Sequence, residues 1–241
     1  MLLAVPGKLR PGQMSLVMLG RVIIGDIAVT LVDLAERGRV ELTEVGQEQE
    51  QPQDGGNNED GVTADPDWTI HVPSRPRPTK QTASSIRPHN IVPFEQALLD
   101  GLSGYAEPTP LNMVAGGFGY VLDKVRAELI REAVHQGWLR RWHHDQRTPE
   151  GDQLARKLRA FRSELRQLKA EHGEDPLTKD WLPFAVHFGF VSPERNPMAR
   201  FARTWNNSFA DMNGWSQPDD PWRRKQDDTI PIDNSATGYY A

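Results

Sequence analysis

The residues best suited to chemistry gather in one basic stretch of the chain, between residues 138 and 166. Guanidinium groups bind carboxylates and phosphates through paired hydrogen bonds, and arginine and tryptophan dominate the energetics of protein interfaces. This stretch therefore predicts a contact surface for an acidic protein segment, an anionic membrane face or phosphate. The alternative is a helix face that is merely solvated. The predicted binding residues are Trp138, Arg140, Arg141, Trp142, Arg156, Arg159 and Arg162.

Histidines in the same region suggest a metal site at first sight. His135, His143 and His144 lie close to Asp145 in the sequence. Adjacent histidines point to opposite faces of a strand, and the other ligands lack the spacing of known zinc sites. We therefore predict neither a metal nor another cofactor.

Motifs typical of enzymes cannot be assembled from the sequence. Cysteine is absent, which excludes thiol catalysis and thiolate metal sites. No serine occupies a Gly-x-Ser-x-Gly elbow, and Gly116, Gly117 and Gly119 lack the spacing of a dinucleotide fingerprint. We expect no catalytic residues and a non-enzymatic protein.

Composition narrows the classes of partner. The chain has 241 residues and a net charge of -5, which argues against a general binder of nucleic acid or of anionic membranes. No apolar run approaches the roughly 18 residues that a membrane-spanning helix needs. The apolar start of the chain is broken by Pro6 and Gly7, so it is too short for a signal peptide. We expect a cytoplasmic protein without a membrane span.

A helix followed by a strand is predicted between residues 25 and 42. Ile27, Leu31 and Leu34 recur at the spacing of one helical face, and Gly38 follows as a helix stop. From Val40 the sequence alternates apolar and charged residues, which is typical of a half-buried strand. A second alternating stretch, residues 67–72, predicts the partner strand of a hairpin.

The same order of helix, glycine and strand recurs around Gly137. Aligning Gly38 with Gly137 places Leu31 opposite Ile130 and Val40 opposite Leu139. A helix followed by a hairpin is the second half of a winged helix. We therefore predict a mostly helical α+β protein with two winged-helix-like units and packed C-terminal helices. The alternative is a single α+β domain with one winged helix and a helical bundle.

Proline-rich and polar stretches suggest where these units begin and end. Residues 46–66 are almost without apolar side chains, so we expect a disordered loop at the tip of the first hairpin. Further helices are expected at residues 94–102, 120–136, 152–171 and 181–191. The predicted division is a first unit at 1–73, a proline-rich linker at 74–93, a second unit with helices at 94–212 and a flexible tail at 213–241.

DNA binding is a less favoured alternative. Winged helices often place the helix before the hairpin in the major groove. In the first unit the outward polar positions, among them Asp26, Asp33 and Glu36, are mainly acidic and would repel phosphate. The second unit should repel phosphate less, because Lys124 and Arg131 balance the acidic side chains there. A DNA-binding regulator would therefore use the second unit and its basic stretch.

Three segments resemble the C-terminal cytoplasmic region of the YciQ-like predicted membrane proteins, a family named for a domain of unknown function. They are GRVIIGDIAVTLVDLAERGRVEL, TPEGDQLARKLRAFRSELRQL and WLPFAVHFGF, and they follow the family's order. Full-length members of the family carry membrane helices ahead of this region, and this chain lacks them. The family has no established activity, so the resemblance implies no catalytic residues. We expect a protein-binding module whose partner is acidic or membrane-associated.

Overall fold

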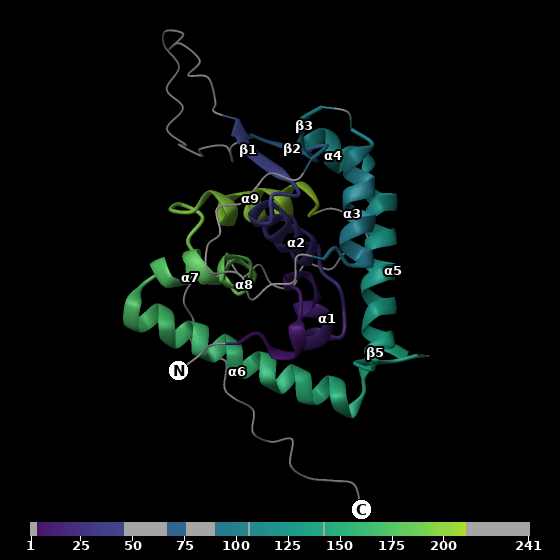
Figure 1. Cartoon of the computed structure of the whole chain (residues 1–241), viewed down its shortest axis with the longest axis vertical. Coiled ribbons are helices and arrows are strands. Elements are labelled where there is room, and N and C mark those ends of the chain that lie inside the picture. Colours follow the sequence, from purple (N-terminus) through teal and green to yellow (C-terminus); the bar gives the residue numbers. More distant parts are fainter. Residues whose placement is uncertain (1–3, 46–66, 76–89, 106, 142, 211–241) are drawn as a thin grey trace, which may run out of the picture.

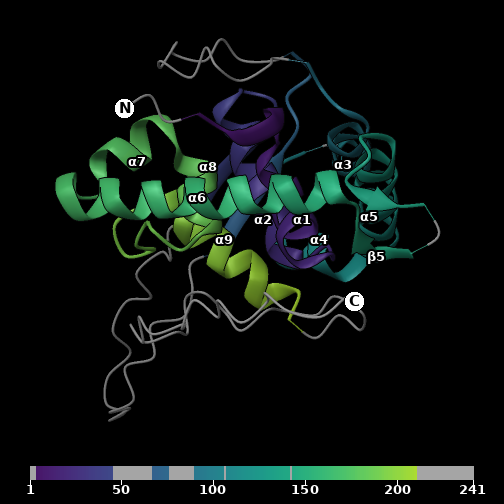
Figure 2. The same ribbon diagram turned by 90° about the horizontal axis from the view of Figure 1, so that it is seen from below.

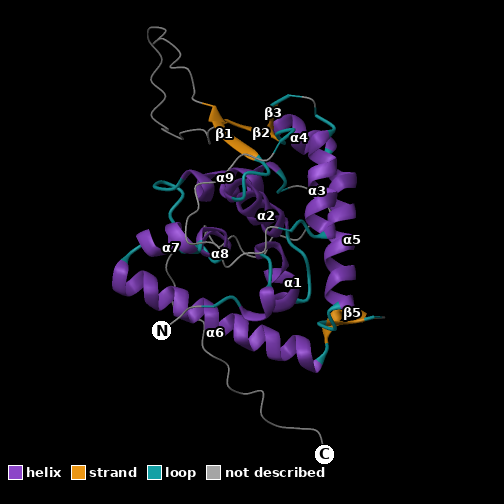
Figure 3. Ribbon diagram, viewed as in Figure 1, coloured by secondary structure: helices purple, strands orange, loops and turns teal. Residues whose placement is uncertain are grey.

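The structure is a computed structural model and is mostly helical, with two small antiparallel sheets among the described residues (Figures 1 and 3). This arrangement confirms the predicted mostly helical α+β class. The described residues are 4–45, 67–75, 90–105, 107–141 and 143–210. The loop predicted at 46–66, most of the linker predicted at 74–93 and the tail predicted at 213–241 lie outside them.

Helix α2 (Ile24–Glu36) is the centre of the fold (Figure 1). Its sequence is apolar almost all round, so it needs cover on every side. The cover comes from α8 (Leu182–His187), α9 (Pro197–Ser208) and the short helix η2 (Pro11–Gln13). Asp26 and Asp33 are therefore buried rather than turned outward, which corrects the expected acidic outer face of this helix.

The other helices surround this centre. Figure 2 shows α6 crossing the face of the molecule that is turned toward the viewer, with α3 and α5 beside each other at one end. The predicted helices at 94–102, 120–136 and 152–171 are present as α3, α5 and α6. The remaining bounds are η1 (Pro6–Lys8), α1 (Met14–Leu19), α3 (Pro93–Ser103), α4 (Leu111–Gly117), α5 (Gly119–His135), α6 (Pro149–His172) and α7 (Asp175–Asp180).

Both predicted glycine stops end their helices in the left-handed conformation. Gly38 has a φ of 66° and Gly137 a φ of 73°, which glycine adopts without steric cost. The backbone N–H of Arg39 donates to the carbonyl of Leu34 at 2.9 Å, and that of Trp138 donates to Ala133 at 2.8 Å. This bonding pattern is the Schellman motif. A strand follows each glycine, as the repeat predicts.

The first sheet joins the two predicted units. β1 (Glu41–Val45) pairs antiparallel with β2 (Asp67–His71), which confirms the predicted hairpin. β3 (Thr109–Pro110) lies on the other side of β2 and comes from the second unit. The second sheet pairs β4 (Leu139–Arg140) with β5 (His143–Arg147), whose polar sequence lacks the alternation of apolar and charged residues seen in β1. The winged-helix interpretation itself stays a prediction.

One buried core serves the whole described chain. It runs from Leu9 to Phe209 and contains residues of both predicted units. The rings of Trp68 and Phe201, one from each unit, meet edge-on with their centroids 5.3 Å apart. The two units therefore do not have separate cores, because α2 of the first is covered by α8 and α9 of the second.

Candidate functional site

Helix α6 carries three of the predicted binding residues, Arg156, Arg159 and Arg162. Thr148 caps its start by accepting a hydrogen bond from the N–H of Gly151 at 3.0 Å, and Pro149 occupies the first turn. One face of the helix is buried through Leu154, Leu158, Phe161 and Leu165, as the apolar spacing predicts. In Figure 1, α6 runs along the lower edge of the described chain, so its opposite face is turned outward.

Four arginines follow one another along α6 at spacings of three, three and four residues, and we call them the arginine row. Residues at these spacings are neighbours on a helix surface, so the row extends over about 15 Å. Glu164 is two residues from its nearest arginines and therefore does not face them. The members of the row are Arg156, Arg159, Arg162 and Arg166.

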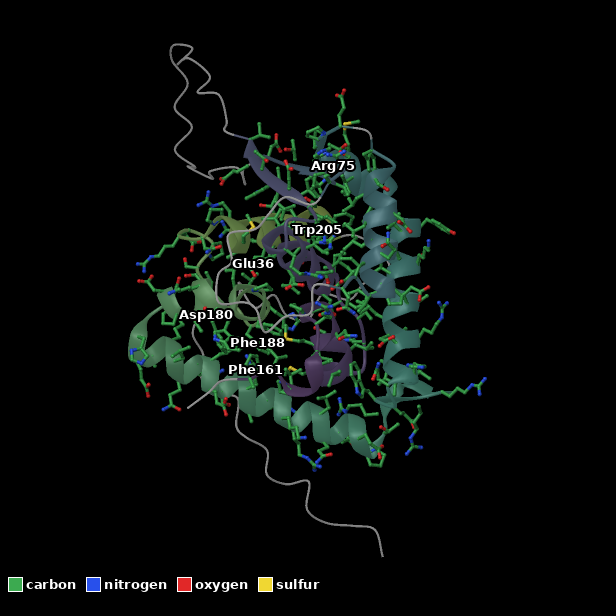
Figure 4. All side chains as sticks on the ribbon, viewed as in Figure 1. Glu36, Arg75, Phe161, Asp180, Phe188 and Trp205 are labelled. Carbon is green, nitrogen blue, oxygen red and sulfur yellow. The ribbon has the colours of Figure 1, made fainter. Side chains whose placement is uncertain are left out.

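The two ends of the row differ in their surroundings. Arg156 and Arg159 are exposed. The guanidinium of Arg162 lies 5.6 Å from the ring centroid of Phe188, and that of Arg166 lies 5.9 Å from the ring centroid of Phe190. Figure 4 shows Phe188 between α6 and α8. Cation–π contacts of this kind favour one orientation of the guanidinium.

The other predicted residues lie where α6 begins. Arg140 and Arg141 are exposed, and Arg140 belongs to β4. Trp138 is half-buried and packs against the core, so only part of its ring faces outward. Trp142 lies outside the described residues. The backbone N–H of Thr148 donates to the carbonyl of Trp138 at 3.0 Å, which holds this strand against the first turn of α6.

A second group of polar side chains, which the sequence did not predict, meets inside the molecule. Ser15 at the start of α1, Asp26 in the first turn of α2 and His187 at the end of α8 meet in the interior, and we call them the buried cluster. The Oγ of Ser15 lies 3.5 Å from Nε2 of His187, and Nδ1 of His187 lies 3.7 Å from Oδ1 of Asp26. The second carboxyl oxygen of Asp26 accepts a hydrogen bond from the N–H of Ile23 at 3.0 Å.

Burial moves the two titratable groups of this cluster in opposite directions. Loss of hydration raises the pKa of Asp26 from 3.8 to about 8, against the hydrogen bonds that lower it. Burial and the nearby charge of Arg162 lower the pKa of His187 from 6.5 to about 3. Both side chains are therefore neutral at pH 7.

The buried cluster has the order of groups found in serine hydrolases, but its properties do not suit that chemistry. Such a relay needs an ionised carboxylate to stabilise the imidazolium, and Asp26 is neutral at pH 7. Ser15 is also only 2% exposed. His187 is 172 positions from Ser15, so the three residues form no local motif. The one signal in the sequence was a histidine inside the apolar run of residues 181–191.

No group of three or more His, Cys, Asp or Glu side chains is placed to hold a metal ion among the residues that the structure describes. The side chains of residues 143–145 are not among them. Within the described ranges, no helix combines the length and apolar composition that crossing a bilayer requires.

Comparisons with protein-family models, with curated proteins and with solved structures found no match.

Proposed function

We propose that this protein is a non-enzymatic interaction module whose arginine row binds an acidic protein segment. The observation that carries the proposal is the stacking of Arg162 and Arg166 on Phe188 and Phe190 at one end of the row. A guanidinium that is already oriented loses less conformational freedom when it binds a carboxylate. The exposed Arg156 and Arg159 extend the same row and would bind the rest of the segment.

The surroundings of the row support an acidic occupant. Two nearby acids have basic partners outside the row: Asp152 pairs with Arg147 at 2.7 Å, and Glu174 pairs with Lys169 at 3.2 Å. The chain is acidic overall, so a local row of arginines stands out from the rest of its charge. The cytoplasm is the location we propose, in line with the cysteine-free sequence and with the family resemblance.

A nucleic-acid partner is the rival proposal, and the fold weakens it. The helix before the first hairpin, α2, is buried and has no outer face to place in a groove. On α5, before the second hairpin, Arg131 is held by Glu128 at 2.6 Å. No described contact favours DNA over an acidic segment.

The proposal is tested with a fluorescent peptide of about twelve glutamates, titrated at low salt and followed by anisotropy. The double variant Arg156→Glu and Arg159→Glu should weaken binding by more than about tenfold, because it reverses two charges in the row. The matched control is Lys124→Glu with Arg131→Glu on α5, which changes the net charge equally and should weaken binding by less than about threefold.

Two results would contradict the proposal. Equal weakening by both double variants would mean that only the overall charge matters. Tighter binding of a duplex DNA or of anionic vesicles than of the peptide, lost in the row variant alone, would assign the row to that other partner.

A further inference from the structure

The buried cluster connects three helices at one carboxyl group. Oδ1 of Asp26 lies 3.4 Å from the backbone N of Ser15, which donates to it, and 3.7 Å from the ring of His187. Ser15 belongs to the first turn of α1 and His187 is the last residue of α8. The contacts of Asp26 therefore fasten α1 and α8 to the start of α2.

A protonated Asp26 adds no charge to this cluster. Its Oδ1 lies 3.7 Å from Nδ1 of His187, which is too far for a hydrogen bond, and the Nε2–H of the neutral ring can donate to the Oγ of Ser15 at 3.5 Å. Loss of the proton leaves a buried carboxylate, which costs free energy unless a cation pairs with it. The state of this proton therefore decides how well the three helices fit together.

Within the described part of the chain, the arginines of the neighbouring elements are directed at groups other than Asp26. Helices α1 and η2 contain no titratable side chain. From α6, Arg162 acts on His187, and it lies over Phe188. From α9, Arg200 and Arg203 pair with Glu44 and Glu194.

We propose that the buried cluster is a proton-controlled latch, which holds α8 and α1 on the start of α2 while Asp26 keeps its proton and loosens when that proton is lost. Opening would expose Asp26 and His187 to water. The latch is independent of the proposed binding of an acidic segment, because it concerns the interior packing of the chain.

The expected pH dependence follows from the protons bound in the closed and open forms. The closed cluster carries one proton, on Asp26, between about pH 3 and about pH 8. The open form also carries one proton, on His187, between the ordinary values of 3.8 and 6.5. Opening is therefore independent of pH in that range. From pH 6.5 to about pH 8 the open form holds fewer protons than the closed form, so opening becomes about eightfold easier over this range.

Hydrogen exchange followed by mass spectrometry tests the latch in the whole protein. After correction for the intrinsic exchange rate, protection of α8 and α1 should fall by about eightfold between pH 6.5 and 8 and be nearly constant from pH 4.5 to 6. Protection of α5 serves as the internal reference and should stay constant. A constant ratio of α8 to α5 protection, or an equal loss in both helices, would overturn the proposal.

Variants separate the two titrating groups. Asp26→Asn should remove the loss of protection above pH 6.5, and the matched Asp123→Asn on the exposed face of α5 should leave it intact. His187→Gln should extend the loss to lower pH, because the open form then no longer takes up a proton. A loss of protection in Asp26→Asn equal to that of the natural protein would refute the latch. Should both cluster variants fail to fold, the pH series of the natural protein still decides.

Discussion

Two helical glycines have very different surroundings, and alanine at each should change stability in opposite directions. A Cβ at Gly151 would lie 2.0 Å from the carbonyl oxygen of Trp138, and this oxygen is backbone that cannot turn away. Gly151→Ala should therefore lower the free energy of unfolding by about 1–3 kcal/mol. Gly116 has no atom within 4 Å of its Cβ position, so Gly116→Ala should raise it by up to about 1 kcal/mol. Urea unfolding measures both, and equal effects would contradict the placement of α6 against β4.

Leu31 tests the burial of α2. Its side chain is fully buried in a helix that is covered by α8, α9 and η2. Leu31→Ala should cost about 2–5 kcal/mol in the free energy of unfolding. Leu19→Ala is the matched control, because Leu19 is about half exposed at the end of α1 and should change stability by less than about 0.5 kcal/mol. A small effect at Leu31 would mean that the helix is wrongly placed.

The sequence predicted the side chains of a candidate site only where they lie close together in the chain. The arginine row is visible in the sequence, because its members lie on one helix at a regular spacing. The stacking of Arg162 on Phe188 was not visible, since it depends on how α8 packs beside α6. The buried cluster was missed for the same reason: Ser15 and His187 are 172 positions apart, and only the packing of α1 and α8 on α2 brings them together.

At the scale of elements, a buried set of charges joins α2 to α3. The Nη2 of Arg37 lies 2.8 Å from Asp33 on its own helix and 2.7 Å from Glu95 on α3. Arg10, next to η2, lies 3.7 Å from the same Glu95, so two arginines balance two carboxylates. Because the buried positive and negative charges are paired, the free-energy cost of removing them from water is largely offset.

Removing one of these buried charges should lower the stability of the protein. Arg37→Ala leaves two buried carboxylates with a single arginine, and it should lower the free energy of unfolding by about 3–5 kcal/mol. Arg131→Ala is the control, because its pair with Glu128 is exposed and should contribute less than about 1 kcal/mol. Thermal unfolding of both variants gives the comparison. Similar losses would mean that the charges around Arg37 are hydrated.

Elements with a strong local pattern were predictable, and those made by distant contacts were not. The spacing of apolar residues predicted α3, α5 and α6, and the two glycine stops predicted where α2 and α5 end. β3 is two residues, Thr109 and Pro110, and it is a strand only because β2 lies beside it. The helix expected at 181–191 is shorter, since Gly189 turns the chain with a φ of 70° after α8.

For the whole molecule, the segment between β1 and β2 should be replaceable. Val45 and Asp67 are paired directly across the hairpin, so a two-residue Asn-Gly turn can connect them. Replacing residues 46–66 by this turn should leave the melting temperature unchanged or raise it by a few degrees, because a shorter loop costs less entropy to close. Differential scanning calorimetry measures it. A fall of more than about 5 °C would show that the segment stabilises the fold.

The third strand of the first sheet, β3, predicts how the protein behaves when it is made as two separate fragments. β3 and α9 complete the sheet and the core around α2, although they follow it by many residues. Two fragments separated between residues 75 and 90 should therefore be poorly folded alone and should recover helical circular dichroism when mixed, as complementing halves do. If the two fragments were fused to two other proteins, their refolding would indicate that those proteins bind each other. Independent folding of either fragment would show that it carries a sufficient core of its own.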